Sequence, residues 1–142
     1  MAKTPFRAEV LTPEGSCFDD EVTMVSTRTK IGSIGIMARH QPLLGMLVPT
    51  ELRLYRGDSD SDIVRFAQGE GYVQVSSDGV LILVEEAQEP GSLDVGDLRD
   101  KLRRAEEALD AAEANTEESR RAARDKRRWE TFLRIAEGGE LK

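Results

Sequence analysis

Apolar and polar residues alternate with a period of two along much of the chain up to residue 87. Residues 6–11 switch between apolar and charged side chains and end at a Thr-Pro-Glu-Gly turn. Short runs of this kind, separated by glycine, proline and aspartate, are typical of half-buried strands joined by tight turns. We expect strands at residues 6–11, 17–18, 22–27, 32–36, 43–48, 52–55, 63–67, 71–75 and 79–84. This spacing favours an antiparallel β-sandwich or a flattened barrel.

The pattern changes after Pro90 and Gly91, where the alternation stops and apolar residues recur at spacings of three and four. Such spacing predicts helices with a narrow apolar seam that needs one partner helix. The first seam comprises Leu98, Leu102, Ala105, Leu109 and Ala112, and the second comprises Ala122, Ala123, Trp129, Phe132, Leu133 and Ala136. Ser92 or Asp94 is the expected cap of the first helix and Thr116 that of the second, with Gly138-Gly139 ending it.

These two patterns predict an α+β chain in two parts. Residues 1–87 form the β-sandwich, residues 88–91 the linker, and residues 92–142 an antiparallel two-helix hairpin. The alanine-rich seam buries little apolar surface, so we expect the hairpin to be only marginally stable by itself.

Composition excludes several functional classes. The formal charge of −7 and the pI near 4.9 argue against a nucleic-acid partner, which normally requires a basic domain. Cys17 is the only cysteine, so an intramolecular disulfide cannot form. The N-terminus lacks the apolar run of a signal peptide, and no stretch approaches the roughly 20 apolar residues of a spanning helix. We therefore expect contact with a membrane only through a partner.

Catalytic chemistry finds little support. His40 is the only histidine, so a His-based metal cluster is impossible, and Cys17 has no context that suggests an activated nucleophile. The acidic run 57–62 has oxygens at alternate positions, as in a calcium loop, but lacks the glycine and glutamate that such a loop needs, so we interpret it as a solvated hairpin tip. We expect no enzymatic activity, no catalytic residues, no cofactor and no metal.

Residues 32–44, Gly-Ser-Ile-Gly-Ile-Met-Ala-Arg-His-Gln-Pro-Leu-Leu, form the most informative stretch. Gly32 and Gly35 alternate with apolar Ile34 and Ile36, which fits a short strand that begins at a bend only glycine tolerates. Pro42 fixes its own φ and keeps the preceding residue out of helical geometry. We expect a compact polar turn between two apolar strands.

The pattern Gly-x-Ile-Gly-Ile-x-x-x-His-x-Pro-Leu-Leu, preceded by a strand at residues 22–27, resembles the signature of the epsilon subunit family of the bacterial rotary ATP synthase (delta in the mitochondrial naming). The resemblance covers essentially the whole chain. It departs at Ser33, where many relatives have an acidic residue, and at Ala38-Arg39, where many have Pro-Gly. It implies a β-sandwich of about ten strands and a subunit contact through Ser33, Arg39 and His40.

The resemblance also implies a function. The chain would be a non-catalytic rotor subunit of the central stalk that couples the γ subunit to the c-ring, peripheral at the cytoplasmic face of the plasma membrane. The hairpin would contact the catalytic β subunits transiently and is a candidate inhibitor of ATP hydrolysis. A second hypothesis stays open: a free-standing binding protein whose coiled-coil hairpin probes another machine.

A basic run in the second helix supports either hypothesis. Arg120, Arg124 and Arg127 repeat at four and three, which places them on one helix face, and we expect Arg121 and Arg128 alongside. The face suits docking on an acidic protein surface. The alternative is a solvated face neutralised by nearby acidic residues.

Some bacterial relatives bind ATP through an Ile/Leu-Asp-x-x-Arg-Ala motif at the start of the first helix. Leu93 and Asp94 match this motif, but Asp97 stands at the arginine position. An anion there repels a polyphosphate, so we expect weak or absent ATP binding.

Overall fold

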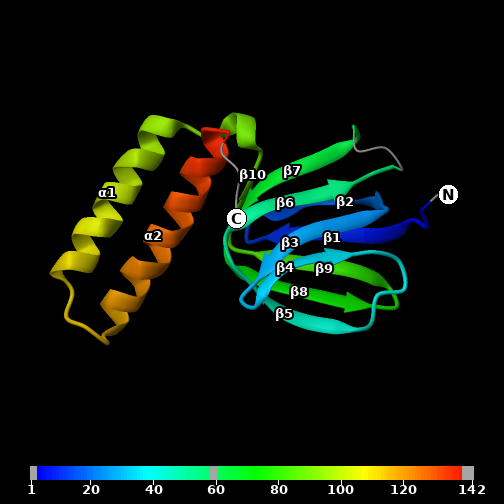
Figure 1. Cartoon of the computed structure of the whole chain (residues 1–142), viewed down its shortest axis with the longest axis horizontal. Helices are drawn as coiled ribbons and strands as arrows, with labels where there is room; N and C mark the ends of the chain where they lie inside the picture. The colour runs from blue at the N-terminus through cyan, green and yellow to red at the C-terminus, as the bar shows by residue number, and fades with distance from the viewer. Residues whose placement is uncertain (1–2, 58–60, 139–142) are drawn as a thin grey trace. The chain divides into compact units, whose positions relative to one another are not determined.

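The computed structural model describes residues 3–57 and 61–138, and the chain divides into two compact units, residues 1–89 and 90–142. The first unit holds all the strands and the second holds both long helices (Figure 1). This confirms the predicted order of a β-sandwich followed by a two-helix hairpin.

The described part of the first unit contains ten strands. Their bounds are β1 Phe6–Thr12, β2 Gly15–Val22, β3 Met24–Thr29, β4 Gly32–Ile36, β5 Leu43–Leu47, β6 Thr50–Tyr55, β7 Ile63–Gln68, β8 Gly71–Ser76, β9 Gly79–Val84 and β10 Ala87–Gln88. The strands pair in the order β10-β7-β6-β3-β5-β8-β9-β1-β2, with β4 paired to β3. Only one pair of residues, Thr29 and Leu47, joins β3 to β5, and there the sheet folds over to make the two layers of a sandwich.

One pairing departs from the antiparallel prediction. β1 and β9 run parallel, with Ala8 opposite Val80 and Leu11 opposite Leu83. Parallel neighbours need a long connection rather than a tight hairpin, and here most of the unit lies between the two strands. Periodicity within each strand carries no information about such a distant partner.

Every second residue of most strands faces inward, and these residues form the core of the sandwich. Val10, Val25, Leu54, Val73 and Ile82 are fully buried and belong to one continuous cluster. Gln68 is also fully buried, and its side chain accepts a hydrogen bond from the Thr27 hydroxyl and donates to the backbone carbonyls of Val48 and Gly69. All its hydrogen-bonding atoms therefore have partners, as a buried amide requires.

Most strand boundaries differ from the predicted ones by one or two residues, and two differences are larger. β2 continues through Asp19 and Asp20, which we interpreted as a terminating turn; it pairs only with β1, so one side faces solvent and tolerates acidic residues. Gln88, placed in the predicted linker, belongs to β10, which was not predicted, and pairs with Ala67 of β7. Residues 58–60 of the predicted hairpin tip at 57–62 lie outside the described residues.

The second unit begins with a short 3₁₀ helix, η1 Pro90–Ser92, followed by α1 Val95–Ala111 and α2 Glu117–Ala136. The long helices lie side by side and antiparallel (Figure 1). Asp94, one of the two candidates, caps α1 by accepting a hydrogen bond from the Asp97 amide, and Thr116 caps α2 by accepting one from the Ser119 amide. Both caps satisfy backbone donors that the first turn leaves free.

The hairpin buries few side chains completely. They are Leu98 and Ala105 of α1 and Ala122, Phe132 and Ile135 of α2. Ile135 was absent from the predicted seam, while Trp129 and Leu133 of that seam are only half-buried. The part of the seam near the connecting loop consists mainly of alanine, so the larger buried side chains, Leu98, Phe132 and Ile135, lie toward the other end of the hairpin.

Candidate functional site

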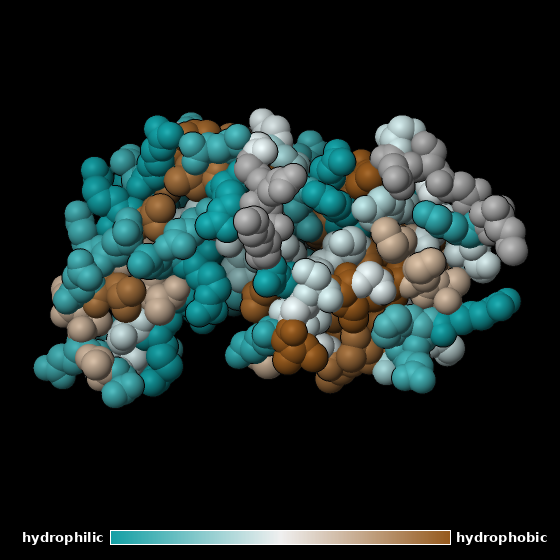
Figure 2. Space-filling view, in the orientation of Figure 1, coloured by the Kyte–Doolittle hydropathy of each residue, from teal (hydrophilic) through white to brown (hydrophobic). Residues whose placement is uncertain are grey.

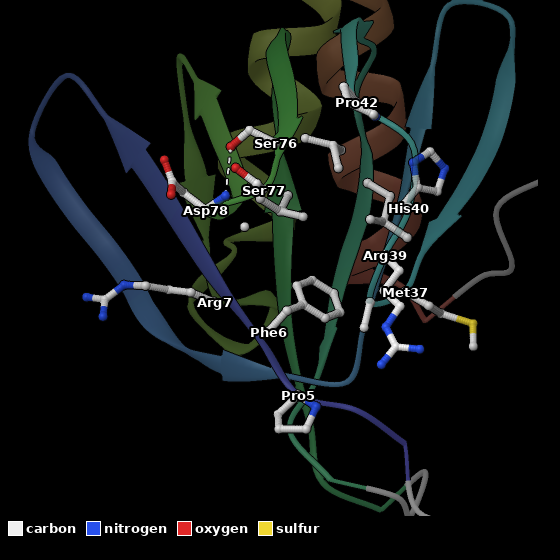
Figure 3. A pocket seen from close by; sticks show the side chains of 15 residues that line it. Pro5, Phe6, Arg7, Met37, Arg39, His40, Pro42, Ser76, Ser77 and Asp78 are labelled. Carbon is white, nitrogen blue, oxygen red and sulfur yellow. Dashed lines mark hydrogen bonds between the residues drawn. The ribbon is translucent and has the colours of Figure 1, made fainter.

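The turn that follows β4 has a conformation stabilised by local hydrogen bonds. The His40 amide donates to the Met37 carbonyl at 3.2 Å, and His40 Nδ1 lies 2.7 Å from the Gln41 carbonyl oxygen, which fixes the imidazole against the turn. Arg39 has φ +67°, in the left-handed region that non-glycine residues rarely adopt. Figure 3 shows this turn from close by.

The structure separates Ser33 from Arg39 and His40. Ser33 lies on β4 next to the exposed β3–β4 hairpin, whereas Arg39 and His40 follow the opposite end of that strand. Ile31, at the tip of this hairpin, is 99% exposed. An apolar side chain so exposed at a hairpin tip is a candidate contact residue that we had not selected. Its place beside the turn at Gly32 was the available signal.

A further apolar surface covers the outer face of β5, β8 and β9. Met46 lies opposite Tyr72, and Tyr72 lies opposite Leu83, so three exposed apolar side chains form one row across the strands. Leu44, 73% exposed, flanks this row on β5. Figure 2 shows apolar side chains gathered over this region of the sandwich. A contiguous patch of this kind marks a protein-interaction surface.

The outer face of α2 is basic. The helix has seven basic and four acidic side chains, a net charge of +3 in a chain whose charge is −7. Arg120, Arg124 and Arg127 are exposed and lie within about 60° of one another around the helix axis. Arg120 contacts Glu117 at 3.4 Å, a solvent-exposed pair of small energetic worth.

Arg121 and Arg128 flank this face, about 60° and 40° from Arg124 around the helix axis. Arg128 stacks on the ring of Trp129, with its guanidinium carbon 5.5 Å from the centroid, and Lys101 of α1 lies 4.8 Å from the same ring. Arg121 borders the alanine-lined notch between α1 and α2. The spacing agrees with the predicted position of both residues alongside the basic face, and their role in binding a partner stays a prediction. The neighbours of each residue, the Trp129 ring and the notch, depend on how α1 packs against α2 and are not shown by a linear spacing.

Arg134 extends the basic face and was missed. The spacing of four and three that relates residues 120, 124 and 127 continues through Thr131 to Arg134, and Arg134 is exposed. The basic face thus comprises Arg120, Arg124, Arg127 and Arg134. Continuing the same spacing along the sequence would have found the fourth member.

The residues that resemble a nucleotide motif have structural partners. The Asp94 carboxylate caps α1, and Asp97 makes an ion pair with Lys101 at 3.1 Å. Both acidic residues thus stabilise the first turn of the helix, where negative charge is favoured.

The described residues offer little chemistry beyond binding. They contain no group of three or more histidine, cysteine or acidic side chains that could hold a metal. Partial burial raises the pKa of the Cys17 thiol, which makes it a poorer nucleophile at neutral pH. No helix in the described ranges 3–57 and 61–138 is long and apolar enough to cross a membrane.

A β-sandwich with an apolar outer face, followed by a hairpin with one basic face, defines a protein-binding subunit. Comparison with known proteins identifies the family. Residues 5–90 match the family described as the ATP synthase Delta/Epsilon chain, beta-sandwich domain. The ATP synthase epsilon chain of Halalkalibacterium halodurans is 38% identical over 127 residues, which is 89% of this chain and 93% of that one. The epsilon chain of Alkalihalophilus pseudofirmus is 38% identical over 105 residues, 74% of this chain and 77% of that one. The chain belongs to the ATP synthase delta/epsilon family.

Solved structures share the fold. A chain of the Euglena gracilis mitochondrial ATP synthase, in a structure of its OSCP, F1 and c-ring, superposes with a TM-score of 0.73 and 17% identity, covering 90% of this chain and 79% of that one. A chain in the central stalk and c-ring structure of the Tetrahymena thermophila mitochondrial ATP synthase gives a TM-score of 0.60 and 18% identity, covering 96% and 99%.

Proposed function

We propose that this chain is a rotor subunit of the central stalk that couples the γ subunit to the c-ring at the cytoplasmic face of the plasma membrane. Membership of the family carries this proposal, together with relatives named epsilon chain that align over most of the length. The subunit performs no chemistry itself; catalysis belongs to the complex.

The surfaces of the sandwich support two separate contacts. The row formed by Met46, Tyr72 and Leu83 offers a flat apolar face suited to a large, permanent interface with γ. Ile31 and Ser33, on the β3–β4 hairpin, form a small projecting contact suited to the c-ring. Arg39 and His40 lie at the other end of β4, so they do not form part of the same contact as Ser33.

The basic face of α2 supports a regulatory contact. Four arginines on one exposed face suit an acidic segment of the catalytic β subunits, because exposed charges of opposite sign steer association and fix register. The marginal packing of the hairpin allows a partner to shift it from a closed to an opened form. An opened α2 inserted against a β subunit would hinder rotation in the hydrolytic direction.

Fractionation of a lysate tests the central assignment. A rotor subunit co-sediments with membranes, and moves to the soluble phase with the catalytic sector when that sector is stripped off. A free-standing protein with a hairpin probe, the second hypothesis, stays in the soluble fraction at low molecular mass before stripping. That second outcome would refute the assignment.

A further inference from the structure

A pocket of about 560 Å³ lies at one end of the sandwich, next to the turn after β4. The start of β1, the end of β4, the turn itself and the β8–β9 hairpin each contribute to its wall (Figure 3). Its size falls within the range of small-molecule sites, about 300–1,000 Å³. Three segments far apart in the sequence, residues 5–7, 36–42 and 75–80, build it, so periodicity alone could not reveal it.

The walls of the pocket are mainly apolar. Phe6 projects into it (Figure 3). Ile36, Val75 and Val80, which are buried and belong to the core, also line it. Pro5 and Pro42 add rigid apolar surface at the rim. Walls of this composition suit an aromatic or aliphatic group.

Arg39 supplies the cation. Among the described residues, its guanidinium has no hydrogen-bond or ion-pair partner. Arg7, also in the wall, is different: its side chain is paired with Asp19 at 2.8 Å and points away from Phe6, as does the carboxylate of Asp78 (Figure 3). The charge available to the pocket is therefore positive.

The backbone of Arg39 adds an independent observation. A long side chain occupies a left-handed position, φ +67°, where glycine would fit without strain. Asn115 is the other non-glycine residue with positive φ in the described ranges, and asparagine commonly adopts this conformation. Strain at a residue that borders a pocket is a mark of a functional site.

We propose that this pocket binds a small amphipathic carboxylate, with its apolar group against Phe6 and its carboxylate on the Arg39 guanidinium. The proposal goes beyond the stalk role and does not depend on it. An exposed charge-assisted hydrogen bond should make a carboxylate bind about tenfold tighter than a neutral analogue of the same shape.

Amide chemical shifts of the isotopically labelled full chain, titrated with 4-phenylbutyrate and then with 4-phenylbutanol, test this. We expect saturable shifts at residues 36–42 and 75–80, with the carboxylate about tenfold tighter. Arg39→Gly should abolish that preference while raising the melting temperature, so misfolding cannot explain the loss. Arg39→Lys should retain most of the preference, and Arg7→Met, the matched control, should leave it unchanged.

Three results with the isolated chain would overturn the proposal: equal affinity for acid and alcohol, an unchanged preference in Arg39→Gly, or shifts confined to the outer face of β5, β8 and β9. A fourth comes from the assembled complex. Equilibrium dialysis distinguishes a free ligand from a carboxylate presented by a partner subunit. Retention of labelled phenylbutyrate by the assembled complex supports a free ligand. Loss of binding on assembly shows that a protein segment fills the pocket, which contradicts a small-molecule site.

Discussion

Replacement of Phe132 by alanine should unfold the hairpin while leaving the sandwich folded. Phe132 has the largest fully buried side chain among the described residues, and its ring meets Trp129 edge-on with centroids 5.9 Å apart. Truncating a buried phenylalanine costs about 3–5 kcal/mol, and loss of the aromatic pair adds about 1 kcal/mol. A unit of this size with an alanine-rich seam has a stability of about 3–5 kcal/mol or less. The expected loss therefore equals or exceeds the whole stability of the hairpin.

The assay uses Trp129, the only tryptophan, as a probe located in the hairpin. Urea unfolding followed by its fluorescence should show a cooperative transition in the wild type and none in Phe132→Ala, with helical circular dichroism falling in parallel. The sandwich should keep dispersed amide signals. Thr131→Ala, at the adjacent and less buried position, is the control and should change stability by about 0.5 kcal/mol or less. If Phe132→Ala keeps a cooperative fluorescence transition with less than about 1 kcal/mol lost, the packing argument is wrong.

Three further outcomes follow from single residues. Gly71→Ala should destabilise the sandwich by about 3 kcal/mol or more in a thermal melt, because the added methyl group would overlap the backbone of Leu83. Gly35→Ala is the control: the nearest atom to its added methyl group is 3.8 Å away, so it should cost about 1 kcal/mol or less. Burial raises the pKa of the Cys17 thiol, so the rate of alkylation should rise with pH through a midpoint above that of free cysteine; a midpoint below it would refute the assigned cause. Calorimetry with ATP should detect no micromolar binding, because Asp97 repels the phosphates, and a micromolar constant would overturn that reasoning.

Local patterns predicted the strands well because each has one face in the core. In β8 and β9, alternate residues such as Val73 and Ile82 are buried, which is the arrangement that the period of two indicates. The same rule failed at Asp19 and Asp20, since an edge strand tolerates charges on its open side. It also failed for the two-residue strand β10, which is too short to carry a period.

The candidate sites were harder to predict because they depend on neighbours in space. The spacing of Arg120, Arg124 and Arg127 fixed a helix face, but the placement of Arg128 against Trp129 depends on how α2 packs on α1. The pocket beside Arg39 forms where the start of β1, the end of β4, the end of β8 and the start of β9 lie together. Neither arrangement leaves a signal within one segment of sequence.

The most direct test of the proposed role is ATP hydrolysis by the assembled complex containing the chain truncated before Ser92. The account predicts faster hydrolysis with the truncated subunit still bound, because the sandwich keeps its contacts while the inhibitory arm is gone. Alanine at Arg120, Arg124 and Arg127 together should give a smaller increase of the same sign, and high salt should reduce the difference from the wild type since screening already weakens exposed pairs. Hydrolysis rates equal to that of the intact complex for both variants would contradict an inhibitory role for the hairpin.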